Sequence, residues 1–369
     1  MPALVLFEET AGVVGKLGCI TLNAPATLNS LTLEMVDLIQ ARLDAWREDP
    51  ELAAIFIVGA GEKGLCAGGD VQALRNSSLA QPGGPCEYAE AFFAREYRMN
   101  YSLHTYPKPL ICWGHGIVMG GGLGILAGCS HRVVTERTRI AMPEVGIALF
   151  PDVGGSWFLN HMPGKTGEFL ALTGASINAA DALFTGIGDR FISSEMECAV
   201  LEQLGRQHWL ADAEANHALV RGVLQDFAER SSEALPGGQV EPHLELINSL
   251  CDTENVHVLI DNICSLVTDD PWLVRARDNL AAGSPLAACW IYRQLRETRH
   301  ASLREVFQAE IQLVTNIIRY PEFAEGVRAL LVDKDRKPAW AYPASRQVPD
   351  AVLDKFFTAP WERNPLADL

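Results

Sequence analysis

Two glycine-rich turns, each directly after an apolar and strand-like run, most strongly limit the folds open to this chain of 369 residues. The first turn, residues 67–70 (Ala-Gly-Gly-Asp), follows the strand and turn of residues 55–65. The second, residues 120–122 (Gly-Gly-Gly), follows the apolar stretch 109–119 and opens a helix. Glycine allows tight turns and lets another group approach the backbone closely. A repeated order of strand, turn and helix is typical of an α/β core.

The first half of the chain alternates strand-like and helix-like segments. Short apolar runs bounded by turn residues predict strands, and apolar residues at helical spacing predict helices. The expected strands span residues 4–7, 17–22, 54–58, 110–113 and 132–134. The expected helices begin after Thr32 and run to Trp46, and span residues 87–104 and 121–128. This order favours a layered α/β fold.

Helical periodicity dominates from about residue 195 to the end of the chain. Ser284 precedes a proline, which is a typical helix start, and Ser302 with Glu305 has the spacing of a capping box. Residues 231–239 contain Pro-Gly-Gly and form the clearest internal linker. We therefore expect two domains, a core with the active site over residues 1–205 and a mainly helical region over residues 206–369.

Charge and composition exclude several classes of partner. The net charge is −16 without a basic stripe, which argues against nucleic acid and against an anionic membrane surface. The nine cysteines include no C-x-x-C pair, and no cysteine and histidine cluster has zinc spacing, so we expect no metal. The most apolar stretch, residues 110–129, is interrupted by His115 and several glycines, which argues against a membrane span. The start of the chain resembles no leader peptide, so we expect a cytoplasmic protein.

The two turns and two later carboxylates suggest chemistry on a carbonyl group. Fixed backbone N–H groups stabilise the negative charge that forms on a carbonyl oxygen during reaction, and each turn can supply one. The second turn opens a helix, where free N–H groups favour an anion. Glu144 follows Met-Pro, and Asp152 lies in Phe-Pro-Asp-Val-Gly-Gly. Each also has an ordinary explanation, since Glu144 can begin a helical turn and Asp152 can shape a bend.

These segments together resemble the active site of the crotonase (enoyl-CoA hydratase/isomerase) superfamily. Within it they are most similar to the 3-hydroxyisobutyryl-CoA hydrolase family. The matching segments are residues 66–70, 92–97, 115–122, 142–144, 149–155, 325–329, 333–335 and 338–340. The resemblance implies an α/β crotonase spiral (ClpP-like) of repeated ββα units, followed by a helical C-terminal region.

The resemblance also implies a role for each matched residue. The N–H groups of Gly69 and Gly121 would form the oxyanion hole. Glu144 would attack the thioester or activate the water that attacks it. Asp152 would hold the 3-hydroxyl group or the water, or help to protonate the leaving thiolate. The remaining residues expected to bind substrate are Glu96, Gly68, Gly120 and Gly122.

Two departures from the hydratases of the superfamily sharpen the implied reaction. Gly124 stands where a hydratase carries a second catalytic glutamate, and Asp152 replaces a glycine that is common in hydratases. The resemblance therefore implies hydrolysis of a short 3-hydroxyacyl-CoA, as in valine catabolism, with CoA as part of the substrate and no separate cofactor. The turn at residues 23–29 lacks the basic residue that superfamily members often place near the CoA phosphates. We also expect a homo-oligomer, as a dimer, trimer or hexamer.

Other functions remain open on the sequence alone. An isomerase can work with Glu144 as its single base, and a hydratase-type reaction uses the same scaffold. A third class is a nucleotide-binding module or a non-catalytic binder of acyl-CoA. Residues 122–127 fit the dinucleotide pattern G-x-G-x-x-A, and Glu144 follows 20 residues after Gly124. That glutamate follows Met-Pro in an expected loop, whereas the dinucleotide pattern requires an acidic residue at the end of a strand.

Overall fold

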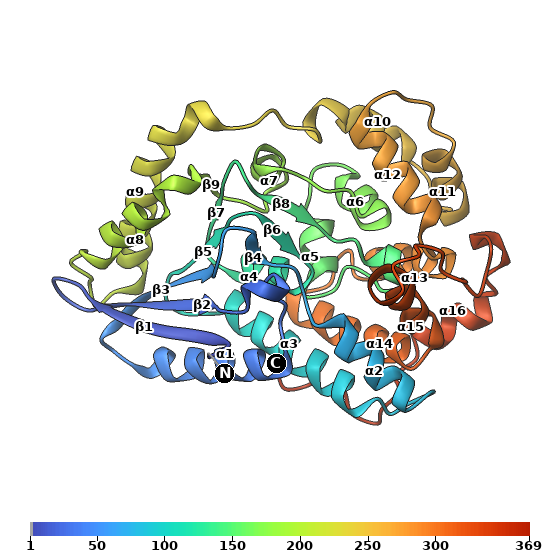
Figure 1. Ribbon diagram of the computed structural model, residues 1–369, viewed down its shortest axis with the longest axis horizontal. Helices are drawn as coiled ribbons and strands as arrows, with labels where there is room; N and C mark the ends of the chain where they lie inside the picture. Colours follow the sequence, from blue (N-terminus) through green and yellow to red (C-terminus); the bar gives the residue numbers. More distant parts are fainter. Residues whose placement is uncertain (1–2) are drawn as a thin grey trace. The chain divides into compact units, whose positions relative to one another are not determined.

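The computed structural model describes residues 3–369, and the strands of this part all lie before residue 192 (Figure 1). The strands are β1 (Val5–Ala11), β2 (Lys16–Leu22), β3 (Leu52–Gly59), β4 (Gly64–Cys66), β5 (Leu110–Gly114), β6 (Ile117–Met119), β7 (His131–Val134), β8 (Arg139–Ala141) and β9 (Arg190–Phe191). The helices before residue 210 are α1 (Leu33–Glu48), α2 (Val71–Ala80), α3 (Glu87–His104), α4 (Gly121–Gly128), α5 (Gly155–Asn160), α6 (Thr166–Thr173), α7 (Ala179–Thr185) and α8 (Glu197–Gly205). The later helices are α9 (Ala213–Ser231), α10 (Leu244–Leu250), α11 (Val256–Cys264), α12 (Pro271–Ala282), α13 (Pro285–Glu297), α14 (Leu303–Ile318), α15 (Pro321–Val327) and α16 (Asp350–Phe356).

The strands form two sheets in a repeated pattern. The larger sheet has the order β1-β2-β3-β5-β7-β9, with β1 antiparallel to β2 and the following neighbours parallel. The smaller sheet has the order β4-β6-β8. Successive strand pairs β3–β4, β5–β6 and β7–β8 each give one strand to each sheet, and the first two are followed by α2 and α4. This is the predicted series of ββα units, and the predicted α/β class is confirmed.

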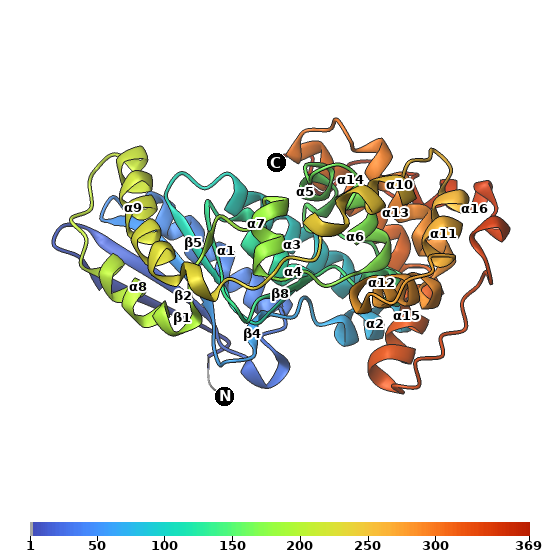
Figure 2. The same cartoon turned by 90° about the horizontal axis from the view of Figure 1, so that it is seen from above.

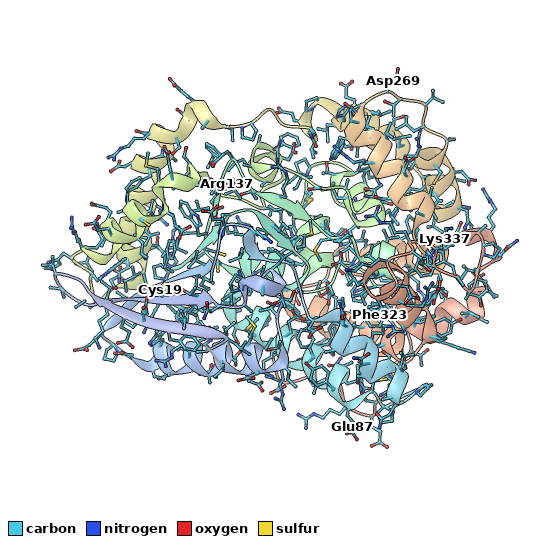
Figure 3. All side chains as sticks on the ribbon, viewed as in Figure 1. Cys19, Glu87, Arg137, Asp269, Phe323 and Lys337 are labelled. Carbon is cyan, nitrogen blue, oxygen red and sulfur yellow. The ribbon has the colours of Figure 1, made fainter. Side chains whose placement is uncertain are left out.

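Both faces of the larger sheet are covered. The side chains of Leu17 and Cys19 on β2 belong to a buried cluster that includes residues of α8 and α9 (Figures 1, 2 and 3). Alternate residues of a strand point to opposite faces. Gly18 accordingly faces α1, where a Cβ atom would stand 2.9 Å from the ring of Trp46. The sheet is therefore a buried layer between helices.

The contacts of the chain divide it into two interleaved compact units. The first contains the described residues up to 69, together with 99–140 and 177–241, and it holds the larger sheet. The second contains residues 70–98, 141–176 and 242–369. This division does not follow the expected boundary after residue 205, because α9 packs on the sheet of the first unit. The last change between units lies at residues 241 and 242, just beyond the predicted linker.

Two long helices of the second unit begin where the sequence predicts. Ser284 caps α13 by accepting a hydrogen bond from the N–H of Ala287, and Ser302 and Glu305 form both bonds of a capping box on α14. Phe323 of α15 is fully buried within this unit, whereas Asp269 and Lys337 lie exposed at its margin (Figure 3). Apolar faces packed on one another therefore hold the unit together.

Three further sequence expectations can be compared with residues 3–369. No helix in this part is both long and apolar enough to cross a membrane. No cluster of three or more metal-binding side chains occurs there either. The cysteines are free thiols, and of these only Cys198 is exposed while Cys264 is half-buried.

Candidate active site

The two glycine-rich turns lie against each other in the first unit. They follow β4 and β6, which pair in parallel with Cys66 opposite Val118. Gly68 has φ +104°, a backbone conformation that glycine adopts without strain. A methyl group on Gly68 would lie 3.4 Å from the carbonyl oxygen of Met119 and 3.7 Å from the nitrogen of Gly121. The expected oxyanion residues Gly69 and Gly121 therefore belong to turns that are in contact.

The second turn presents free N–H groups at a helix start. Gly120 is the N-cap of α4 and has φ +48°, and Gly121 is the first helical residue. The first N–H groups of a helix have no carbonyl partner within it, and they carry the positive end of the helix dipole. The N–H of Gly121 can therefore donate to an oxygen atom that carries developing negative charge.

Gly122 fixes the spacing of the two turns, and we expect Gly122→Ala to be strongly destabilising. Its Cβ would lie only 2.3 Å from the carbonyl oxygen of Cys66, so α4 would have to move away from the first turn. Overpacking of this kind costs about 1–3 kcal/mol, and each kcal/mol lowers the melting temperature by about 2–4 °C. Thermal unfolding and turnover measure both effects.

The matched control is Gly222→Ala on α9. A Cβ at Gly222 would meet no atom within 4 Å, so the substitution gains helix propensity without a clash. We expect Gly222→Ala to melt at or slightly above the wild-type temperature, with full turnover. Equal melting temperatures for the two variants would contradict the close contact of the turns.

Three carboxyl groups gather in the second unit. Glu96 on α3 is 2 % exposed, Glu144 in the 3-10 turn Glu144–Ile147 is 6 % exposed, and Asp152 in the loop before α5 is 4 % exposed. The hydroxyl of Tyr97 donates a hydrogen bond of 2.7 Å to Oδ2 of Asp152. Among residues 3–369, neither Oε1 of Glu96 nor Oε2 of Glu144 has a hydrogen-bond partner. Buried carboxyl oxygens without partners are unusual in folded proteins and indicate a functional site.

Burial raises the pKa of all three groups. Desolvation raises the pKa of Glu96 and of Glu144 well above the usual value, and the negative charge of Asp152 raises both further. Desolvation also raises the pKa of Asp152 to about 7, although the hydrogen bond from Tyr97 opposes this shift. A carboxyl group with a pKa near neutrality can both give and take a proton under physiological conditions.

Two contacts stabilise the turn that carries Glu144. The N–H of Ser284 donates a 3.0 Å hydrogen bond to the carbonyl oxygen of Val145. Gly326 of α15 packs so closely that a Cβ there would lie 2.6 Å from the backbone of Ile147. Gly326 belongs to the late Glu-Gly-Val-Arg-Ala segment, which therefore supports the turn that bears Glu144.

A cavity of about 410 Å³ lies beside the same turn. It is lined by Pro143, Val145, Gly146, Thr173, Gly174, Asn279, Ala282, Gly283, Ala329, Leu330, Arg336 and Pro338. Arg336 is the one charged residue in this lining. The cavity is thus large enough for part of a small-molecule ligand and offers one cationic group.

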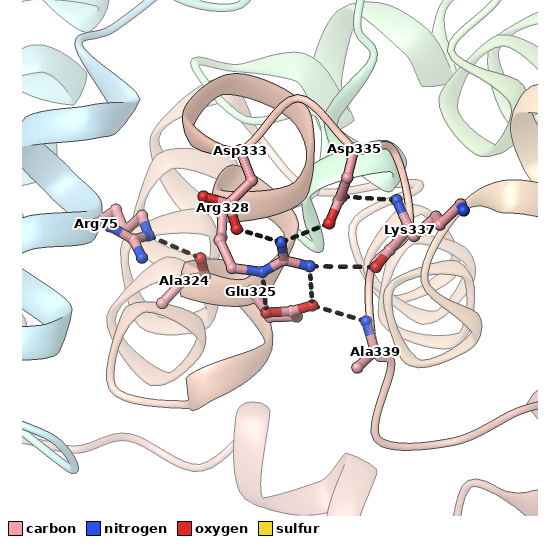
Figure 4. Close-up of polar contacts among 8 residues, drawn as sticks. All are labelled: Arg75, Ala324, Glu325, Arg328, Asp333, Asp335, Lys337 and Ala339. Atoms are coloured by element: carbon pink, nitrogen blue, oxygen red, sulfur yellow. Dashed lines mark hydrogen bonds and ion pairs between the residues drawn. The ribbon is translucent and has the colours of Figure 1, made fainter.

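Arg328 makes a network of polar contacts with the segment of residues 333–337 (Figure 4). Its guanidinium group forms two bonds with the carboxylate of Glu325, at 2.8 and 2.9 Å. It also contacts Asp333 at 2.5 Å and Asp335 at 2.8 Å, and donates to the carbonyl of Lys337 at 3.1 Å. Such a bidentate pair within a network fixes geometry better than isolated surface pairs do. The late acidic motif therefore orders the cavity wall.

Comparison with known proteins agrees with this arrangement. The profile of the family described as "Enoyl-CoA hydratase/isomerase" matches residues 17–357. The chain belongs to this family. It is 37% identical to the mitochondrial 3-hydroxyisobutyryl-CoA hydrolase of Danio rerio over 362 residues, which cover 98% of this chain and 91% of the relative. It is 36% identical to the human protein of the same name over 344 residues, which cover 93% of this chain and 86% of the relative.

Two solved structures of the enoyl-CoA hydratase/isomerase type share the fold. An enoyl-CoA hydratase from Rhodobacter sphaeroides 2.4.1 has a TM-score of 0.83 and 31% identity, with 97% of this chain and 98% of that chain covered. A carnitinyl-CoA dehydratase from Mycobacterium thermoresistibile has a TM-score of 0.82 and 32% identity, with 98% of each chain covered. The crotonase fold expected from the sequence is confirmed.

The structure of this enoyl-CoA hydratase/isomerase family member brings the expected residues together in two groups. The five glycines Gly68, Gly69, Gly120, Gly121 and Gly122 lie in the paired turns of the first unit. The three carboxyl groups Glu96, Glu144 and Asp152 lie in the second unit. Glu96 lies on the inward side of α3, where its side chain is buried.

Two residues near the carboxyl groups had no functional role in the sequence analysis. Tyr97 lies inside a matched motif, and its hydroxyl donates a hydrogen bond to Asp152. Glu310 on α14 is fully buried and accepts two hydrogen bonds from the loop after Asp152. A signal for Glu310 was present, because it occupies the apolar stripe of α14 formed by Phe307, Ile311 and Val314.

Proposed function

We propose that this chain hydrolyses a short-chain 3-hydroxyacyl-CoA thioester, of the 3-hydroxyisobutyryl-CoA kind, to the free acid and CoA. The observation that carries the proposal is the buried pair Glu144 and Asp152, in a chain that has no side chain at Gly124. The names of the relatives, which are alike over more than nine tenths of this chain, support the same reaction.

The oxyanion hole is the first part of the proposed mechanism. The N–H groups of Gly69 and Gly121 would donate to the thioester oxygen as it becomes negative. Because both turns are fixed by folding, no reorganisation accompanies the reaction, which is the main source of such stabilisation. The close approach of Gly68 to the second turn supports this assignment.

Glu144 and Asp152 would divide the remaining steps. Ionised Glu144 attacks the carbonyl carbon, or removes a proton from the water that attacks it, and the C–S bond then breaks. Asp152, with a pKa of about 7, gives a proton to the leaving sulfur. Where Glu144 is the nucleophile, water then breaks the bond between Glu144 and the acyl group and returns a proton to Asp152. Where Glu144 is the base, the proton that it took from water passes back to Asp152. Overall one water is consumed, and its OH and H end on the acyl group and on CoA.

Glu96 would bind the polar end of the acyl group. Its buried carboxyl group is raised in pKa and therefore holds its proton readily, so it can donate a hydrogen bond as well as accept one. A 3-hydroxyl group both donates and accepts, which matches a protonated carboxyl group. CoA enters as part of the substrate, and no separate cofactor is needed for this chemistry.

Three further expectations concern the assembly, the partners and the location of the enzyme. We expect a homo-oligomer, as a dimer, trimer or hexamer, with acyl-CoA as its small-molecule partner. We expect no nucleic-acid partner. We propose a cytoplasmic location, although the names of the relatives describe mitochondrial proteins. Light scattering measures the oligomeric state, and cell fractionation of the native protein measures its location.

Hydration or isomerisation of an enoyl-CoA is the second candidate function. It is favoured by the two solved structures, which are those of an enoyl-CoA hydratase and a carnitinyl-CoA dehydratase. Gly124 argues against it, because hydration in this superfamily uses a glutamate at this position. A purely binding role is less consistent with two buried carboxyl groups of raised pKa.

Release of free thiol from 3-hydroxyisobutyryl-CoA distinguishes these functions. We expect rapid thiol release with this substrate, and at least about tenfold slower hydration of crotonyl-CoA and isomerisation of a 3-enoyl-CoA. Saturated butyryl-CoA, which lacks the hydroxyl group, is the control for recognition by Glu96. If crotonyl-CoA is hydrated while no thiol appears from the hydroxyacyl substrate, the hydrolase proposal fails.

A further inference from the structure

Asp152 lies at the start of a strained loop. Val153, the next residue, has φ +56°, and its branched side chain is fully buried. A β-branched residue in the left-handed region is a genuine outlier and costs on the order of 1–3 kcal/mol. Gly154 follows with φ +83°, and the N–H of Gly155 closes the bend with a 2.7 Å hydrogen bond to the carbonyl of Asp152. Strain of this kind persists only where the surroundings hold it.

Glu310 on α14 stabilises the strained loop by hydrogen bonds. Its Oε2 accepts a 2.8 Å hydrogen bond from the N–H of Gly154, and its Oε1 accepts a 2.9 Å hydrogen bond from the N–H of Ser156. The carboxyl group is fully buried, as is Ser156. The side chain of Glu310 thus binds the backbone on both sides of the bend, although it lies 156 residues from Gly154 and 154 residues from Ser156 in the sequence.

Phe307 and Tyr97 complete the support around the loop. The ring of Phe307, one turn before Glu310 on α14, lies 3.1 Å from where a Cβ of Gly154 would be. The rings of Phe307 and Tyr97 are in contact, with centroids 5.9 Å apart, and Tyr97 binds the carboxyl group of Asp152. Helix α14 therefore fixes the backbone of the loop, and α3 fixes the side chain that the loop carries.

Burial of a carboxyl group at position 310 is unfavourable unless the group makes compensating hydrogen bonds. Burial raises the pKa of Glu310 to about 8 against the opposing effect of the two N–H bonds, and the charge of Asp152 contributes to the rise. An apolar side chain on the stripe of α14 would avoid this desolvation. It would leave the N–H groups of Gly154 and Ser156 without acceptors and release the bend.

We infer that Glu310 is a positioning residue, which sets the place of the Asp152 carboxyl group by holding the strained loop through the N–H groups of Gly154 and Ser156. The inference rests on the proposed function of Asp152. It adds a residue from the late helical part of the chain to the reaction, although Glu310 itself touches no reacting atom.

The test is a double-mutant cycle of Glu310→Gln and Asp152→Asn, with thiol release as the assay. An amide at position 310 keeps one acceptor but places an NH2 group against a second N–H. We expect Glu310→Gln to lower kcat about tenfold or more in the wild-type background and less than about twofold in the Asp152→Asn background, since a residue acting through Asp152 has nothing left to position. Hydrogen exchange should rise in residues 150–157 and stay unchanged in α12 and α15.

The matched control is Glu305→Gln on the same helix, where the carboxylate is exposed and only caps the helix start. It should change kcat less than about twofold. Equal losses from Glu310→Gln in both backgrounds would mean a general structural role, and full activity of Glu310→Gln would mean none; either result overturns the inference. Full activity of Asp152→Asn would instead overturn the proposed role of Asp152, which is a separate outcome.

Discussion

Glu144→Gln should abolish most turnover while acyl-CoA still binds. The amide has nearly the same shape as the carboxyl group but can neither attack a thioester nor take a proton from water. Loss of a general base or nucleophile lowers kcat by about 10²–10⁴-fold. Burial and the charge of Asp152 raise the pKa of Glu144 and so favour its neutral form. The neutral amide should therefore be tolerated well. Steady-state kinetics and calorimetry with a CoA thioester measure the two effects.

The control for Glu144→Gln is the same change at an exposed site. Glu254 is 96 % exposed in its side chain, and Glu254→Gln should leave kcat within about twofold of wild type. The melting temperature of Glu144→Gln should equal or exceed that of the wild type above neutral pH, because a group with a raised pKa no longer has to ionise in the interior. A Glu144→Gln variant that keeps more than about a tenth of its turnover would remove Glu144 from the mechanism.

Local signals in the sequence were sufficient for most of the fold. Thr32 caps α1, Ser284 caps α13 and Ser302 caps α14 as their positions in the sequence predict. These are interactions between near neighbours, so short segments contain the information for them. The strand β3 was equally clear because its residues are buried on both faces, which requires a continuous apolar run.

The division of the chain into units depends on contacts between distant segments. The helical pattern after residue 195 predicts that α9 is a helix, but it does not predict that the apolar face of α9 packs on β2 and β3. The second unit collects residues 70–98, 141–176 and 242–369. The crossings fall at different kinds of place, between β4 and α2, inside α3 and inside β8 among them, so no local pattern marks them.

The candidate site shows the same limit at the level of single residues. Glu144 and Asp152 were predicted because each stands in a short motif, whereas the partners that control them are far away in the sequence. Glu310 lies 156 residues from Gly154, and its role depends on a strained bend that no pattern predicts. A polar residue on the apolar face of a helix is nevertheless a readable signal, since burial without a partner is unfavourable. Glu310 could have been found in this way.

Asp152→Asn should lower turnover about 10²-fold and change the dependence of the rate on pH. In the wild type, Asp152 has a pKa of about 7, so thiol release should decline as pH rises above 7 and the acid loses its proton. The Asn variant should lack this decline. Because the charge of Asp152 raises the pKa of Glu144, the rising limb that reports ionisation of Glu144 should move to lower pH in the variant. An unchanged profile would contradict the coupling of the two groups.

The stability of Asp152→Asn should depend on pH in a direction that follows from the same shift. Burial raises the folded-state pKa of Asp152 from 3.8 to about 7, so between these values the folded protein binds more protons than the unfolded chain. The wild type therefore loses stability as pH rises through this window, by on the order of 2–4 kcal/mol, and the Asn variant does not. Melting curves should show that the melting temperature of the variant, relative to that of the wild type, is higher at pH 8 than at pH 5. A constant difference between the two proteins would mean that Asp152 is ionised throughout, and it could then not act as the acid.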